Sequence, residues 1–109
     1  MCALASLRHP ADFARLRRHG RRLSTKSLTI YRADARAGDG GSLVGIAVNK
    51  TIGKAVVRNK LRRRLSAILR QTLCSQPATR VLIVARPPAA QLPFADLAAE
   101  VTSALAAAY

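Results

Sequence analysis

Residues 50–70 read KTIGKAVVRNKLRRRLSAILR, a stretch with eight Lys or Arg side chains and no acidic one. Its apolar residues recur at the three- and four-residue spacing of a helical face, which predicts an amphipathic helix over residues 54–74. The apolar face consists of Val57, Leu61, Leu65, Ile68 and Leu69. The opposite face consists of Asn59, Arg62, Arg63, Ser66 and Arg70. Because guanidinium groups match the geometry of phosphate oxygens, this polar face predicts a surface that binds a polyanion.

Three segments are predicted to be β-strands, at residues 26–32, 43–49 and 80–86. The first two flank a Gly-rich turn at residues 33–42 and are expected to pair with each other as a hairpin. The third segment has a continuous apolar centre, which is typical of a strand buried on both faces. Together they predict a small mixed sheet.

Two further helices are predicted outside these strands. One covers residues 10–19, with a proline at its first position and Gly20 after its end. The other begins at Pro93 and carries an inward stripe of Phe94, Leu97, Val101 and Leu105. The order αββαβα indicates an α+β fold in which helices pack on the sheet. Residues 1–109 are expected to form one domain.

The charge balance points to a polyanionic partner. The chain has 19 Lys or Arg and 5 Asp or Glu, a net charge of +14. Nucleic acid is the first candidate partner and an anionic membrane surface the second. The chain shows no secretory signal pattern and no apolar run near the ~18 residues of a membrane span. Cys2 and Cys74 form no disulfide framework, and Cys74 is expected to be a small apolar residue, so we expect a soluble, cytoplasmic protein.

The acidic residues are too dispersed to indicate a catalytic centre. A protein that hydrolyses phosphodiesters usually gathers carboxylates around metal ions. The five acids lie on separate predicted elements, at Asp12, Asp34, Asp39, Asp96 and Glu100. His9 and His19 have no ligand-like neighbours, and no nucleophilic triad or phosphate-binding loop is present. We therefore expect binding, without a metal site on the protein, to be the chain's main role.

Two aromatic residues, Phe13 and Tyr31, admit two interpretations. Both are ordinary candidates for the hydrophobic core. Both are also candidates for a platform on which unpaired bases stack, since every base has a π-face. The sequence leaves both interpretations open.

The segment from Lys54 to Arg63, KAVVRNKLRR, resembles the signature segment of the bacterial ribonuclease P protein component family. Further segments resemble that family in the same order: residues 12–20 its first helix, residues 44–50 the strand before the signature, and residues 83–87 the exit from a later strand. The resemblance covers nearly the whole chain.

The resemblance implies a fold like the second domain of ribosomal protein S5, with a left-handed βαβ crossover. It implies that the chain is the accessory subunit of an endoribonuclease whose catalyst is a partner RNA using Mg²⁺, and that the protein alone is not catalytic. The reaction is removal of the 5′ leader from precursor tRNA. The implied partners are ribonuclease P RNA and precursor tRNA, with one protein per RNA and no membrane.

The resemblance also implies two groups of site residues. The residues expected to contact the catalytic RNA are Arg58, Asn59, Lys60, Arg62, Arg63 and, in place of the basic residue usual at position 66, Arg70. The residues expected to line a cleft for the single-stranded leader are Phe13, Arg17, Tyr31 and Lys50. Lys60 replaces an Arg of the family pattern, which keeps the charge but loses a planar fork. Arg17 replaces a frequent aromatic residue, which shifts leader binding from stacking towards charge.

Two other functions compete with this one. A general RNA-binding or ribosome-associated protein would bind structured RNAs alike without altering tRNA 5′ processing. A cationic protein of the membrane surface would bind anionic lipid, although the buried type of strand at residues 80–86 argues against it.

Overall fold

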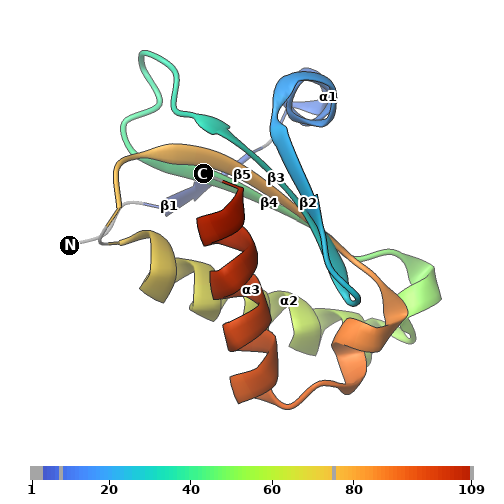
Figure 1. The fold of residues 1–109 in the computed structure, drawn as a ribbon. Helices are drawn as coiled ribbons and strands as arrows, with labels where there is room; N and C mark the ends of the chain where they lie inside the picture. Colours follow the sequence, from blue (N-terminus) through green and yellow to red (C-terminus); the bar gives the residue numbers. More distant parts are fainter. Residues whose placement is uncertain (1–3, 8, 75, 109) are drawn as a thin grey trace.

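A five-stranded sheet forms the centre of the computed structural model, which describes residues 4–7, 9–74 and 76–108 (Figure 1). The strands are Leu4–Ser6 (β1), Arg21–Ser24 (β2), Leu28–Asp34 (β3), Ser42–Ala47 (β4) and Thr79–Ala85 (β5). The helices are Pro10–His19 (α1), Ala55–Leu73 (α2) and Phe94–Ala107 (α3), with 3₁₀ turns at Lys50–Ile52 (η1) and Pro87–Gln91 (η2). Helix α1 lies on one face of the sheet, and α2 and α3 cover the other (Figure 1). The predicted α+β class is confirmed.

The central strand is β5, as its apolar sequence predicts. The strand order is β1-β4-β5-β3-β2, and β5 pairs parallel with β4 and antiparallel with β3. Val81, Leu82 and Ile83 are almost completely buried. Because β4 and β5 are parallel neighbours joined through α2, they form a βαβ unit. The hand of that crossover stays a prediction.

The predicted hairpin between residues 26–32 and 43–49 is wrong. The corresponding strands, β3 and β4, do not pair with each other, because β5 lies between them. A strand with two apolar faces is stabilised most at the centre of a sheet, where helices cover both faces. The edge strands β1 and β2 were not predicted, since they are only 3 and 4 residues long and β2 begins with two arginines. The element order is therefore βαβββαβα.

The larger of two apolar clusters lies between the sheet and the pair α2 and α3. Helix α2 contributes Leu61, Leu65, Ile68, Leu69 and Leu73. Helix α3 contributes Leu97, Val101, Ala104 and Leu105. Burying each Leu, Ile or Val side chain contributes roughly 1.5–3 kcal/mol, so this layer dominates the stability of the fold.

Two residues predicted to lie in these apolar stripes are instead exposed. Val57 is 38% exposed and Phe94 is 40% exposed. Each lies in the first turn of its helix, before the helix reaches the sheet. Helical periodicity marks the direction of a side chain but not how far along the helix the core extends.

A buried arginine ties the end of α3 to the sheet. Arg32 in β3 donates to the Leu105 carbonyl oxygen at 2.9 Å and to Gln76 Oε1 at 2.7 Å. Its Nε donates to Thr79 Oγ1 at 3.2 Å. A cation is favourable here because the C-terminal carbonyl groups of a helix carry partial negative charge.

Two expectations for Cys74, that it is a small apolar residue and that it takes part in no disulfide, are wrong, because Cys74 is exposed at the end of α2 and is disulfide-bonded. Cys2 lies outside the described residues.

Within residues 4–7, 9–74 and 76–108, no helix is both long and apolar enough to cross a membrane.

Candidate nucleic-acid interface

The exposed side of α2 is the first candidate surface. Leu61 and Leu65 face the core, which turns the intervening polar positions towards solvent. The exposed predicted residues are Asn59, Lys60, Arg62, Arg63 and Arg70. Helix α2 contains no acidic residue, so no carboxylate on the helix itself neutralises this row. The arrangement presents several cations at fixed positions, as a phosphate-binding surface requires.

Two other arginines of α2 differ from this exposed row. Arg58, a predicted RNA contact, is half-buried, and its Nε finds no hydrogen-bond acceptor among the described residues. Arg64 is also half-buried and donates to the Leu92 carbonyl oxygen at 3.2 Å. Arg64 therefore holds α2 against the segment that precedes α3, whereas the Nε of Arg58 is buried without a hydrogen-bond partner among the described residues.

The sheet face beneath α1 is the second candidate surface. A small apolar cluster there contains buried Leu7, Leu16 and Leu82, with Phe13 and Tyr31 packed against it. Tyr31 is opposite Leu82 on β5, and Leu82 is opposite Gly45 on β4, so all three project from one face. The structure thus brings Phe13 and Tyr31 to one surface. Both are half-buried, which combines core packing with partial ring exposure.

The two cations predicted for the same surface occupy different positions. Arg17 is exposed on α1, one turn after Phe13, and thus shares its side of the helix. Lys50 is exposed at the start of η1, shortly after β4. The Asn49 side chain accepts a hydrogen bond from the Thr51 backbone N–H at 3.1 Å and fixes this turn. No described contact joins Lys50 to Phe13 or Tyr31.

Two arginines near Tyr31 were missed by sequence reasoning. Arg22 is exposed and lies directly opposite Tyr31 in the β2–β3 pair. Arg86 donates to Thr29 Oγ1 at 2.8 Å and to the Leu28 carbonyl oxygen at 3.0 Å. Thr29 shares the α1-facing side of β3 with Tyr31, since residues two apart on a strand point the same way. Arg22 could have been placed beside Tyr31 only by predicting strand β2, and the short basic sequence of β2 does not indicate a strand.

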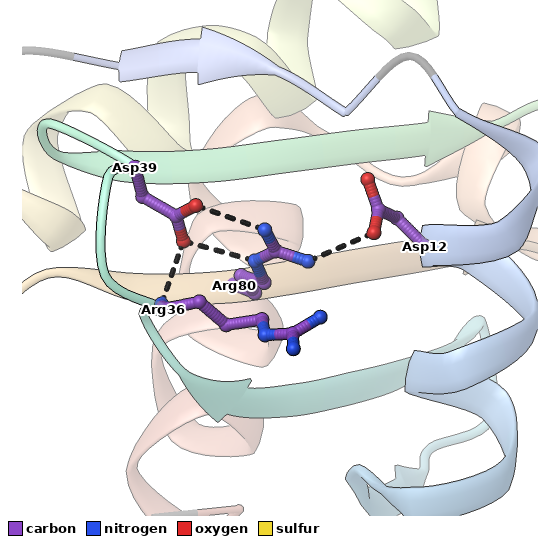
Figure 2. A network of polar contacts seen from close by, with 4 residues as sticks. All are labelled: Asp12, Arg36, Asp39 and Arg80. Carbon is purple, nitrogen blue, oxygen red and sulfur yellow. Dashed lines mark hydrogen bonds and ion pairs between the residues drawn. The ribbon is translucent and has the colours of Figure 1, made fainter.

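A further arginine on the α1-facing side, Arg80, is engaged within the protein (Figure 2). Its Nε and Nη2 donate to Asp39 at 2.9 and 2.8 Å, and its Nη1 donates to Asp12 at 3.0 Å. Asp39 also accepts the Arg36 backbone N–H at 2.8 Å. These hydrogen bonds, that from Arg80 first, lower the pKa of Asp39 to about 2. In turn, the hydrogen bond to Asp39 raises the pKa of Arg80. We call these contacts the Arg80 network.

The remaining acids are dispersed. Glu100 accepts the Ser27 backbone N–H at 3.2 Å, and Asp34 and Asp96 are exposed. In the part of the chain that the structure describes, no three His, Cys, Asp or Glu side chains gather as a metal site would require. What the geometry offers is therefore two basic surfaces, one helical and one with aromatic rings.

Comparison with known proteins shows which family this chain resembles. A family model described as Ribonuclease P matches residues 1–109. The ribonuclease P protein component of Thermobifida fusca is 41% identical over 108 residues, which cover 93% of this chain and 74% of that protein. The corresponding protein of Acidothermus cellulolyticus is 39% identical over 95 residues, which cover 86% of this chain and 79% of that protein.

Solved structures show the same fold. The RNase P protein of Staphylococcus aureus superposes with a TM-score of 0.85 at 24% identity, and the alignment covers 94% of each chain. The RNase P protein of Thermotoga maritima gives a TM-score of 0.76 at 22% identity, over 90% of this chain and 92% of that one.

Proposed function

This chain belongs to the ribonuclease P protein family, which implies a role in tRNA 5′ processing, and we propose that it acts there as an RNA-binding subunit. It binds the catalytic RNA through α2 and the 5′ leader of precursor tRNA through the sheet face beneath α1. The RNA performs the endonucleolytic cleavage that removes the leader, and the protein assists it. One protein binds one RNA in the cytoplasm.

The exposed row on α2 is the observation that carries this proposal. Lys60, Arg62 and Arg63 point to solvent from a helix anchored by a buried leucine stripe, so the backbone position that carries each cation is fixed before RNA arrives. Pre-organised donors lose less conformational entropy on binding than donors on a mobile tail. Asn59 adds a side chain that can hydrogen-bond to ribose or to base edges.

The leader surface is supported by its combination of rings and charge. Tyr31 and Phe13 offer partly exposed rings for stacking, and Arg17 on α1 and Arg22 on β2 are exposed cations on the same elements or beside them. Lys50 adds an exposed cation on η1, after β4. Single strands bind to such surfaces through base stacking and backbone electrostatics together. Because Arg17 is a cation, electrostatic attraction supplies part of the affinity for the leader that stacking on an aromatic residue would supply.

The Mg²⁺ ions of the reaction are proposed to be held by the RNA. Mg²⁺ binds through oxygen ligands, chiefly carboxylates and phosphates. Asp12 and Asp39 both hydrogen-bond to Arg80, and Glu100 to the Ser27 backbone. This donor set does not fit a protein-bound metal, and the protein's part is to bind and orient RNA.

The decisive experiment is cleavage of a precursor tRNA by the cognate ribonuclease P RNA at low Mg²⁺, with and without this protein. We expect the protein to restore cleavage at the mature 5′ end and to be inert without the RNA. If it engages about six phosphates, log K should fall against log salt with a slope of roughly −4 to −5. Binding to both RNAs without any effect on cleavage would instead favour a general RNA-binding protein.

A further inference from the structure

Arg80 differs in its environment from the exposed arginines of α2. Its side chain is only 11% exposed and is hydrogen-bonded through all three guanidinium nitrogens. The chain has only 5 acidic residues, and two of them, Asp12 and Asp39, contact this one guanidinium. On a protein of net charge +14, acids that could pair with many cations are concentrated here. Arg80 therefore joins segments within the protein, and its guanidinium group is not available to bind phosphate.

The Arg80 network joins three segments that are distant in sequence. Arg80 lies on β5, Asp12 in the first turn of α1, and Asp39 in the loop between β3 and β4 (Figure 2). Asp12 directly precedes Phe13, the aromatic residue of α1 that packs on the sheet. The contact between Asp12 and Arg80 therefore acts one residue away from a ring proposed to bind the leader.

Apolar packing alone holds α1 weakly. Only Leu16 of this helix is buried, and the cluster that it joins has two further buried members, Leu7 and Leu82. A cavity of about 180 Å³ lies beside the helix, lined by Asp12, Arg15 and His19 of α1 and by Ala33, Arg36 and Arg80 opposite. Since the helix does not fill this side, the position of its first turn over the sheet depends on the polar contact between Asp12 and Arg80.

We propose that Arg80 is a positioning residue for leader recognition: through Asp12 it sets where α1 holds Phe13 over the sheet. The inference rests on the proposed function, because it assumes that the surface of Phe13 and Tyr31 receives the leader. Arg80 acts through Asp12 and touches no RNA.

The test compares precursor tRNA with and without a 5′ leader, using the complex of protein and ribonuclease P RNA. Asp12→Asn keeps the shape of the side chain but weakens its bond to Arg80. We expect this variant to lower the preference for leader-bearing RNA by roughly 3- to 10-fold, part of the stacking contribution of one base. KM for leader-bearing RNA should rise while kcat at saturation stays unchanged, and Asp12→Glu should restore most of the preference.

Asp96→Asn is the matched control, because it removes the same charge from an exposed position on α3. Removing either acid raises the net charge by one unit, which by itself strengthens binding to any RNA. A loss confined to leader-bearing RNA in Asp12→Asn, with no change of preference in Asp96→Asn, would support the proposal. Equal preference in Asp12→Asn and the wild type, with the fold intact by circular dichroism, would overturn it. A wild-type complex without leader preference would overturn the proposed leader surface as well.

Discussion

The ring of Phe13 lies against the backbone of Gly45, so closely that a Cβ atom at position 45 would come within 2.5 Å of Phe13 Cε1. The same Cβ would be 3.3 Å from Leu82 Cδ1. A side chain at position 45 is therefore incompatible with the observed position of Phe13. Glycine on β4 fixes the depth at which α1 places its aromatic residue, while the Arg80 network fixes the adjacent Asp12.

Gly45→Ala is expected to displace Phe13 and destabilise the protein by about 1–3 kcal/mol, the usual cost of inserting a methyl group into a packed site. Leader-bearing RNA should lose affinity, whereas leaderless RNA should not. Urea unfolding and the two binding measurements check this. Gly40→Ala is the control: nothing lies within 4 Å of its new Cβ, and its φ of +70° produces only local strain. An unchanged leader preference in Gly45→Ala would contradict the assigned role of Phe13.

Arg62→Ala combined with Arg63→Ala is expected to weaken association with ribonuclease P RNA and to leave the fold intact, because both side chains are exposed. Losing two phosphate contacts should make the slope of log K against log salt less negative by roughly 1 to 2. Binding titrations at several salt concentrations measure this.

Arg64→Ala provides the contrast on the same helix. It removes the hydrogen bond to the Leu92 carbonyl and should lower the free energy of unfolding by about 0.5–1.5 kcal/mol, with a smaller effect on the salt slope. Loss of the helical circular dichroism signal in the Arg62 and Arg63 double variant would show that these residues support the fold.

Tyr31→Ala is expected to harm mainly the binding of leader-bearing RNA, by about 1–3 kcal/mol if one base stacks on the ring. Tyr31→Phe keeps the ring and should retain most of that affinity. Affinity measurements with the two precursor forms separate these outcomes. Equal losses for leaderless RNA would place Tyr31 in the core alone.

The ion pair of Asp39 with Arg80 should make stability depend on acid pH. The folded pKa of Asp39 is about 2, below the ordinary value of 3.8 for this carboxyl group, so the unfolded state binds the proton more readily. The stabilisation by Asp39 is then complete above pH 5 and is lost as the pH falls through 3.8 towards 2. Asp39→Asn should destabilise the protein at pH 7. The difference in the free energy of unfolding between this variant and the wild type should shrink as the pH falls through 3.8 towards 2.

Urea unfolding at pH 7, 4, 3 and 2.5 measures this dependence. Arg80→Met supplies the control background, because it removes the cation while keeping a long apolar stem. In that background Asp39→Asn should change stability much less at every pH. A pH dependence that persists without Arg80 would assign the effect to other carboxyl groups.

Local patterns in the sequence predicted the helices and the central strand well. Helix α2 was expected over residues 54–74 and runs over Ala55–Leu73. The apolar centre of residues 80–86 correctly indicated a strand buried on both faces. The exposed side of α2 followed from the same periodicity, since a helix repeats every 3.6 residues and its faces depend only on near neighbours.

The pairing of strands and the partners of Arg80 could not be read in this way. Strand β5 lies between two strands expected to form a hairpin, and the pairing of β2 with β3 places Arg22 opposite Tyr31. Arg80 donates to Asp39 and Asp12, which lie 41 and 68 residues away along the chain. The amphipathic basic helix, the apolar central strand and the excess of positive charge follow from the amino-acid sequence, because these are properties of neighbouring residues. The strand order, the closeness of Phe13 to Gly45 and the Arg80 network emerge from the folded chain alone, because they depend on contacts between segments whose separation in sequence carries no periodic signal.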